Sequence, residues 1–118
     1  MAESYKHLEV WKDAVILAES IYLITKKYPK EETFNCVTQL RRAVVSVSSN
    51  IAEGSSRKSK KDFSRFIEIA RGSLYEIESL IEISLKLEYI TVETYTHLTE
   101  DINKLGGKLG AFYNYLQK

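Results

Sequence analysis

Residues 37–54 read VTQLRRAVVSVSSNIAEG, and their apolar side chains recur at alternating steps of three and four residues. The recurring set is Val37, Leu40, Val44, Val47 and Ile51. This spacing places one apolar stripe along a helix, so the stretch predicts an amphipathic α-helix that faces partner helices. No part of the chain shows the strict alternation of a half-buried strand, and we therefore predict an all-α fold.

Three further stretches carry the same spacing on either side of this helix. They run from Leu8 to Tyr22, from Phe63 to Ile81 and from Tyr95 to Leu116. Pro29 separates the first two helices, and Ser59 and Thr91 stand where a hydroxyl group would cap the third and fourth. Because the connections are short, we predict an antiparallel up-down-up-down four-helix bundle that forms a single domain over residues 1–118.

Composition restricts the class of protein further. Hydrophobic residues make up 44% of the chain and charged residues 28%, as in an ordinary globular domain and unlike a disordered tail. Cys36 is the only cysteine, so the chain forms no internal disulfide and a reducing compartment suits it. The first ten residues, MAESYKHLEV, lack the apolar segment of a signal peptide, and no apolar run is long enough for a membrane span. We therefore expect a cytoplasmic protein.

The first and third predicted helices carry more apolar residues than one stripe needs. A second row lies one position before the first row and includes Val10 and Leu17 in one helix, and Phe66 and Ile69 in the other. Two interpretations stay open at this stage. The row either widens the core face or meets another copy of the chain, since a leftover apolar patch usually marks an association site.

Three glycines fall inside the fourth apolar stripe, at Gly106, Gly107 and Gly110. Each costs about 1 kcal/mol of helix stability relative to alanine, so some feature should compensate. Close approach of a neighbouring helix or subunit would do so, and a local kink is the alternative. The candidate residues for an interface between subunits are Val10, Leu17, Phe66, Ile69, Gly106 and Gly110.

Groups that could perform catalysis do not occur in a productive pattern. A di-iron bundle enzyme needs Glu-x-x-His pairs, and neither His7 nor His97 has a glutamate three residues before it. The serines of residues 46–49 lack the strand-turn-helix setting of a nucleophile elbow. We predict no catalytic residue, no metal site and no cofactor, and we expect that the protein is not an enzyme.

The run SVSSNIAEG at residues 46–54 is rich in residues that form helices poorly. Their hydroxyl and amide groups can bond to carbonyl groups one turn earlier and bend a helix. Such a segment either joins its helix to neighbouring helices or binds a ligand directly. We favour the first interpretation.

Positive charge is concentrated in one part of a nearly neutral chain. Residues 1–72 carry a net charge of +4, and residues 73–118 carry a net charge of −3. Much of the positive excess lies at the junction between the second and third helices, where it would suit a phosphate backbone, although basic loop residues are more often only solvated. The candidate nucleic-acid-binding residues are Arg41, Arg42, Arg57, Lys58, Lys60, Lys61 and Arg65.

Four elements together resemble one known family: LEVW at 8–11, QLRRA at 39–43, SNIAEG at 49–54 and FIEIARGSL at 66–74. The resemblance is to the bacterial four-helix-bundle family of 23S rRNA-intervening-sequence proteins, and it covers nearly the whole chain. This family includes relatives of the accessory variability protein of diversity-generating retroelements. The resemblance implies a homopentameric ring or barrel, and for the retroelement relatives it implies nucleic-acid binding. The motif residues expected to be structural are Trp11, Ser49, Asn50, Glu53 and Gly54.

One functional hypothesis and one alternative follow. We expect a non-enzymatic homo-oligomer, pentameric by the resemblance, that binds RNA or DNA weakly and without sequence preference through the basic junction. Self-association would repeat one modest patch and raise its effective concentration. The alternative is a scaffold whose apolar faces recruit another protein.

Overall fold

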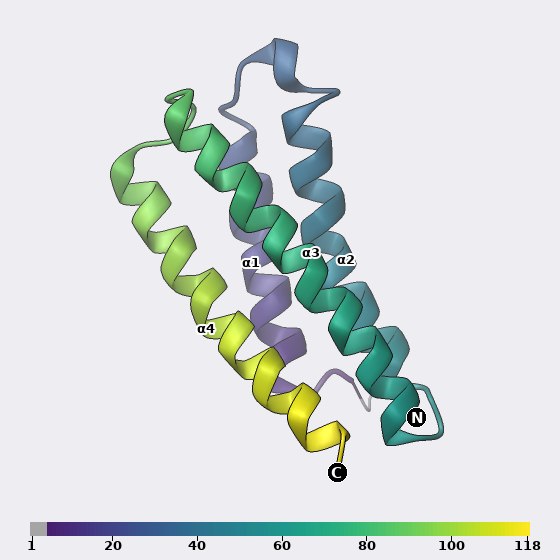
Figure 1. The fold of residues 1–118 in the computed structure, drawn as a ribbon. Helices are drawn as coiled ribbons and strands as arrows, with labels where there is room; N and C mark the ends of the chain where they lie inside the picture. The colour runs from purple at the N-terminus through teal and green to yellow at the C-terminus, as the bar shows by residue number, and fades with distance from the viewer. Residues whose placement is uncertain (1–4) are drawn as a thin grey trace.

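The computed structural model describes residues 5–118; residues 1–4, which belong to the predicted domain of residues 1–118, lie outside the described residues. The described chain contains α1 (Glu9–Thr25), a short 3-10 helix η2 (Lys30–Glu32), α2 (Cys36–Ser55), α3 (Lys60–Lys86) and α4 (Val92–Leu116). Consecutive α-helices run in opposite directions (Figure 1). Residues 5–118 contain no strand, and the predicted all-α four-helix bundle is confirmed.

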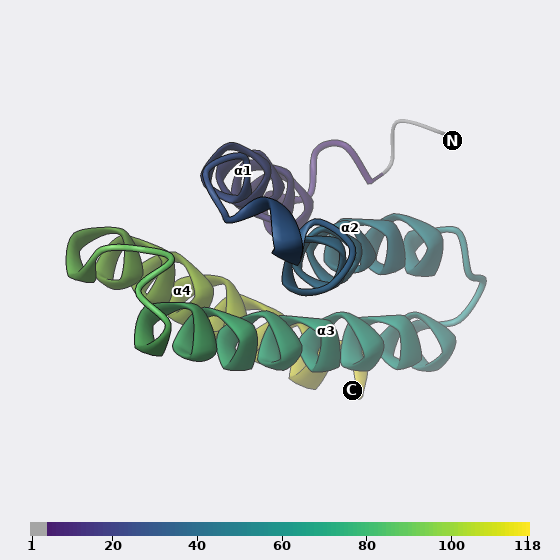
Figure 2. The same ribbon diagram turned by 90° about the horizontal axis from the view of Figure 1, so that it is seen from above.

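The bundle is elongated, with principal extents of 43 × 22 × 20 Å. Seen from above, α1 and α2 lie on one side of the bundle, and α4 and α3 lie on the other (Figure 2). The contact between α2 and α3 is the most extensive, and α1 touches α4 least among the neighbouring pairs. The centre of the bundle is therefore built around the α2–α3 pair.

The apolar stripe of α2 forms the middle of the core. Leu40, Val44, Val47 and Ile51 have no exposed surface. Burial of each such side chain contributes about 1.5–3 kcal/mol relative to leaving it in water. The stripes of α3 and α4 bury their central residues in the same way, so the predicted core faces of three helices are confirmed.

The α1 helix presents a different face to the core from the one predicted. Its buried residues are Val10, Ala14, Leu17 and Ile21, whereas Trp11 in the predicted stripe is only half-buried. Val10 and Leu17 are 7% and 2% exposed, so their assignment to an interface between subunits is corrected. Two adjacent apolar rows leave the rotation of a helix about its axis open, and the positions of α2 and α4 decide it.

The predicted caps form at the starts of α3 and α4. The backbone N–H of Asp62 donates to Ser59 Oγ at 3.1 Å, and the backbone N–H of Thr94 donates to Thr91 Oγ1 at 3.1 Å. Each hydroxyl satisfies one of the amides that a helix leaves unpaired in its first turn. These caps define where α3 and α4 begin.

The end of α3 is formed by a residue in the left-handed region. Glu88 has a φ of 61°, its backbone N–H donates to the carbonyl oxygen of Leu85, and that of Tyr89 donates to the carbonyl oxygen of Ser84. This pair of bonds is a Schellman ending, where glycine is the usual residue. The chain thereby reverses into α4 within a few residues.

Candidate nucleic-acid interface

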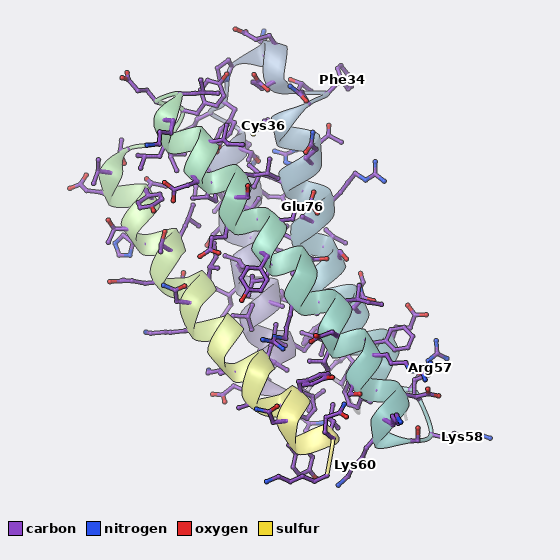
Figure 3. All side chains as sticks on the ribbon, viewed as in Figure 1. Phe34, Cys36, Arg57, Lys58, Lys60 and Glu76 are labelled. Atoms are coloured by element: carbon purple, nitrogen blue, oxygen red, sulfur yellow. The ribbon has the colours of Figure 1, made fainter. Side chains whose placement is uncertain are left out.

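The basic junction is the turn between the end of α2 and the start of α3. The hydroxyl groups of Ser55 and Ser56 donate to the carbonyl oxygens of Ala52 and Glu53, each at 2.7 Å. They add to the backbone bonds of the helix end, where the carbonyl oxygen of Glu53 also accepts the backbone N–H of Ser56 at 3.1 Å. The α2 helix therefore ends at Ser55, and the basic residues that follow lie at one end of the bundle (Figure 3).

Gly54 brings α2 and α3 close together just before the junction. A Cβ atom at this position would lie 2.7 Å from Phe66 Cβ and 2.8 Å from Phe63 Cδ1. A larger residue would push α3 away, because non-bonded carbon atoms do not approach one another this closely. The glycine of the SNIAEG motif thus has a structural role, as expected.

Two cations of the junction lie against aromatic rings. The guanidinium group of Arg57 lies 4.6 Å from the centre of the Phe66 ring and bonds to Glu53 Oε2 at 3.1 Å. The ammonium group of Lys60 lies 4.5 Å from the centre of the Tyr115 ring in α4. Arg57 is therefore already paired with a carboxylate, whereas Lys60 contacts a ring and makes no ion pair with residues 5–118.

Four exposed cations at this end of the bundle make no ion pair with any other residue among 5–118: Lys58, Lys60, Lys61 and Arg65. Asp62 in the first turn of α3 is the one acidic residue between Lys58 and Arg65. Unpaired surface cations are the groups that release counterions when they meet a phosphate backbone. The arrangement can therefore attract a polyanion without breaking an ion pair among residues 5–118.

Arg41 lies outside this cluster and has a structural role. Its Nε donates to Thr25 Oγ1 at 3.0 Å, its Nη2 donates to the carbonyl oxygen of Tyr22 at 3.3 Å, and its guanidinium group lies 4.6 Å from the centre of the Tyr22 ring. The side chain thus ties α2 to the end of α1.

Arg42 is exposed beside Arg41 and is also remote from the junction. Fifteen residues of chain separate Arg42 from Arg57, and a helix rises about 1.5 Å per residue, so roughly 20 Å of α2 lies between them. Arg41 and Arg42 therefore lie apart from the basic junction, and their part in nucleic-acid binding stays a prediction. The reason for the separation is that residues fifteen positions apart in one stretch of sequence become widely separated along the bundle axis when that stretch is helical.

Aromatic side chains connect the junction to the core. Phe63 packs edge-on against Phe112 with ring centres 5.2 Å apart, and Phe112 stacks on Tyr115 at 6.2 Å with an angle of 12° between the rings. Tyr115 is 54% exposed. Sequence reasoning did not identify Tyr115 as a site residue. The predicted antiparallel pairing of α3 and α4 was the available signal, because it places the end of α4 beside the start of α3.

The polar residues of the α2 motif bond within α2 and to α3. Asn50 Nδ2 donates to the carbonyl oxygen and to Oγ of Ser46, at 2.8 and 3.0 Å, and Ser73 Oγ donates to Ser46 Oγ at 2.9 Å. The prediction that this segment joins its helix to a neighbour is confirmed. Ser49 is exposed, and Trp11 packs edge-on against Tyr5 with ring centres 5.1 Å apart.

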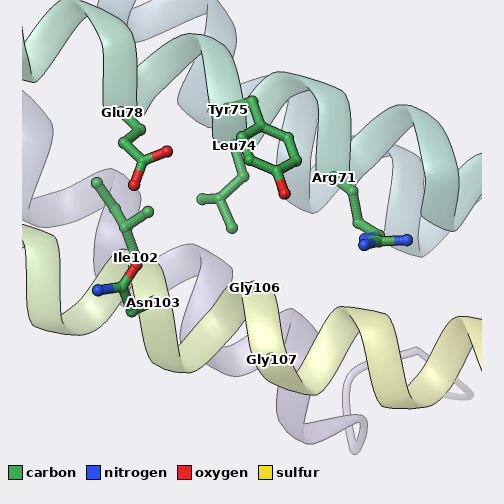
Figure 4. A pocket seen from close by; sticks show the side chains of 8 residues that line it. All are labelled: Arg71, Leu74, Tyr75, Glu78, Ile102, Asn103, Gly106 and Gly107. Carbon is green, nitrogen blue, oxygen red and sulfur yellow. The ribbon is translucent and has the colours of Figure 1, made fainter.

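Among residues 5–118, the glycines of α4 meet no more than ordinary side-chain contacts from α3. A Cβ on Gly106 would lie 3.5 Å from Leu74 Cδ2, one on Gly110 would lie 3.9 Å from Arg71 Nη2, and one on Gly107 would have no atom of these residues within 4 Å. Gly106 and Gly107 instead line a cavity of about 210 Å³ between α3 and α4 (Figure 4). Within residues 5–118 the approach of a neighbouring helix is limited to ordinary contacts such as that between Gly106 and Leu74, and a contact with another subunit stays a prediction.

The remaining two candidate interface residues lie on α3. Ile69 is 53% exposed, and Phe66 is half-buried beneath the guanidinium group of Arg57. Ile83 and Leu87 extend the exposed apolar surface toward the end of α3, with exposures of 47% and 53%. The second apolar row thus reaches the surface on α3, although on α1 it is in the core.

Reactive and metal-binding groups are sparse over the described chain. Burial raises the pKa of the Cys36 thiol, so the thiol stays protonated at neutral pH, and Cys36 Sγ lies 3.8 Å from Ser84 Oγ. Residues 5–118 hold no cluster of three or more His, Cys, Asp or Glu side chains placed to bind a metal ion. Within the same residues, no helix combines the length and apolar character needed to cross a membrane.

The fold and the junction define a class of protein: a small antiparallel four-helix bundle with exposed cations at one end. Residues 6–111 match the family model of the 23S rRNA-intervening sequence proteins, and the chain belongs to this family. The resemblance inferred from the sequence is therefore confirmed.

A solved structure supports the same assignment. It is the crystal structure of a protein with unknown function from the S23 ribosomal protein family of Bacteroides thetaiotaomicron, with a TM-score of 0.80 and 25% sequence identity. The similarity covers 88% of this chain and 97% of that chain. No curated protein matches the chain. The description of neither the family nor this relative names an enzymatic activity.

Proposed function

We propose that this protein is a non-enzymatic homo-oligomer that binds the backbone of RNA or DNA weakly and without sequence preference. The observation that carries the proposal is the group of four exposed cations at the α2–α3 junction that make no ion pair within residues 5–118. Phosphate contacts of this kind supply affinity but carry no sequence information.

Affinity from one chain is modest, and assembly raises it. Four phosphate contacts give a slope of about −3 for log affinity against log salt, which is about a 50-fold loss between 50 and 200 mM salt. Identical junctions held together in one assembly multiply this contact through effective concentration. The exposed residues Ile69, Ile83 and Leu87 of α3 and the uncovered Gly107 of α4 are the surfaces that support assembly. The family resemblance favours a pentamer.

A charge-matched pair of variants tests the binding surface. The test variant replaces four junction cations with alanine: Lys58, Lys60, Lys61 and Arg65. The control replaces four exposed lysines at the other end of the bundle: Lys26, Lys27, Lys30 and Lys86. Fluorescence anisotropy with a labelled oligonucleotide at 50 mM salt should show at least a tenfold loss for the junction variant and less than a threefold loss for the control. Equal losses would contradict a defined binding surface and would mean that binding depends only on the net charge of the protein.

Light scattering tests the assembly. The purified protein should have a mass several times 13.6 kDa, and a pentamer is the expected species. A monomer that persists at high protein concentration would contradict the proposal that assembly raises the affinity for nucleic acid.

A protein-interaction scaffold is the second candidate, and one observation favours it. The Phe34 side chain is 94% exposed and lies beside a groove between α2 and α3 that includes Arg42 and Glu76 (Figure 3). An exposed aromatic side chain beside polar groups is a common anchor in protein interfaces. A polypeptide that is captured after nuclease treatment by the wild-type protein, and is lost with Phe34→Ala, would favour this candidate.

A further inference from the structure

The Tyr115 ring is an exposed aromatic surface inside the basic junction. It lies in the last turn of α4, and the antiparallel pairing of α4 with α3 places it against Lys60 at the start of α3. Figure 3 shows Lys60 beside the C-terminal end of α4. Stacking on Phe112, which itself packs edge-on against Phe63, holds the ring in position. The junction therefore combines cations that make no ion pair within residues 5–118 with one ring that is supported from the core.

Much of the Tyr115 side chain is open to solvent and is not used in packing the core. Tyr115 is 54% exposed, and its hydroxyl group makes no hydrogen bond with another residue among 5–118. By contrast, the hydroxyl groups of Tyr89 and Tyr95 bond to carboxylates at 2.8 and 2.7 Å. Among residues 5–118, the Tyr115 ring is thus contacted by Phe112 and by the Lys60 ammonium group, and its hydroxyl group has no partner.

The relative strength of two contacts indicates what the ring can bind. An ammonium group over an exposed ring is worth about a two- to fivefold effect on an equilibrium, whereas a nucleobase stacked on an aromatic side chain is worth about 5- to 150-fold. A base can therefore displace the Lys60 ammonium group from the ring. The displaced ammonium group is then free to contact the phosphate of the same nucleotide.

We propose that Tyr115 and Lys60 form a stacking site for an unpaired nucleobase, so that the preferred ligand of the junction is single-stranded nucleic acid. This inference rests on the proposed binding at the junction and narrows its ligand class. In a duplex, each base is covered by its neighbours and reaches the surface only by its edges. Only a single strand offers a free base face to the ring while its phosphates meet Lys58 and Lys61.

Oligonucleotides that differ in one property at a time test the site. The probes are labelled oligouridine and oligodeoxyuridine of about twenty nucleotides, an abasic strand with the same number of phosphates, and a duplex of the same length. Tyr115→Ala is the test variant. Tyr75→Ala is the matched control, because Tyr75 is 67% exposed on α3 and contacts none of the junction cations.

Tyr115→Ala should weaken binding to both single strands at least fivefold and should leave binding to the abasic strand and the duplex unchanged. Tyr75→Ala should bind every probe as the wild-type protein does, and Tyr115→Trp should restore the single-strand affinity. Comparison of oligouridine with oligodeoxyuridine, which differ only in the sugar, then separates RNA from DNA as the preferred strand. An equal loss for all four probes, or no loss for any, would overturn the stacking site.

Failure of this site can be distinguished from failure of the junction. If the junction variant loses binding but Tyr115→Ala does not, phosphate contacts remain and the stacking site is rejected. If the wild-type protein binds no probe at low salt, both proposals are rejected.

Tryptophan fluorescence, measured at saturation, reports base stacking directly and needs no comparison of affinities. Trp11 is the only tryptophan of the chain, so Trp11→Phe combined with Tyr115→Trp places the only indole at the site. A saturating oligouridine strand should quench its fluorescence, and the abasic strand should not.

Discussion

The backbone of Gly54 in α2 lies directly against Phe66 in α3, so close that a Cβ atom on residue 54 would stand 2.7 Å from Phe66 Cβ. The nearby Phe63 ring limits the space from the other side, at 2.8 Å. This contact sets the separation of the two helices that carry the basic junction, and it lies immediately before the exposed cations.

Gly54→Ala should therefore destabilise the bundle. Overpacking at a rigid contact costs about 1–3 kcal/mol, which outweighs the gain of about 1 kcal/mol from replacing glycine in a helix. Gly72→Ala is the control, because nothing lies within 4 Å of a Cβ at Gly72, and it should gain up to about 1 kcal/mol. Urea denaturation measures both changes. Equal stabilities for the two variants would contradict the close approach at Gly54.

Truncation of two adjacent arginines in α2 should have different effects on the stability of the bundle. Arg41→Ala removes hydrogen bonds to Thr25 and to the carbonyl oxygen of Tyr22, and should cost about 1.5–3 kcal/mol of unfolding free energy. Arg42→Ala removes an exposed side chain and should change stability by less than about 0.5 kcal/mol. Neither variant should weaken nucleic-acid binding more than a distant lysine variant does. A large loss of binding in Arg42→Ala would place the interface along α2.

Glu88 offers a site for stabilisation. Its φ of 61° is a conformation that costs a residue with a Cβ atom roughly 1–2 kcal/mol, and glycine avoids this cost. Glu88→Gly should raise the melting temperature, and Glu88→Ala should not. A melting temperature that falls with Glu88→Gly would mean that the Glu88 side chain itself holds the turn.

The bundle should lose stability at alkaline pH. Burial raises the pKa of the Cys36 thiol and the pKa of the Tyr28 phenol above their ordinary values. Because the folded pKa lies above the unfolded one, this stability is complete below the unfolded thiol pKa of about 8.5 and is lost as the pH rises through the folded pKa. Thermal melts between pH 7 and pH 10.5 should show the decline beginning at a higher pH in Cys36→Ala. An identical decline in the variant would show that ionisation of the Cys36 thiol does not contribute to the loss of stability.

Gly107 distinguishes a subunit interface from an open surface. No atom of residues 5–118 lies within 4 Å of a Cβ at this position, so Gly107→Ala should stabilise the isolated bundle by about 1 kcal/mol. If copies pack against α4, the added methyl group should also weaken association, and sedimentation equilibrium measures that change. Unchanged association would place the interface elsewhere, with the exposed apolar residues of α3 as the next candidate.

The sequence determined the helices and most of their core faces. Apolar side chains at steps of three and four can bury together only if the backbone is helical, so Leu40, Val44 and Ile51 had one possible role. The caps at Ser59 and Thr91 were equally predictable, because a hydroxyl group before a helix bonds to amides of the same turn. These features depend on residues close in sequence, and one chain segment contains all the information.

Only the tertiary structure decided the orientation of α1 and the membership of the basic site. Val10 and Leu17 lie in the core because two adjacent apolar rows permit two rotations of a helix, and packing against α2 and α4 selects one. Arg41 bonds to α1 because helical rise carries it far from the junction, while Tyr115 meets Lys60 across 55 residues of sequence. Such contacts arise between separate helices, and their geometry is set by how the bundle packs as a whole.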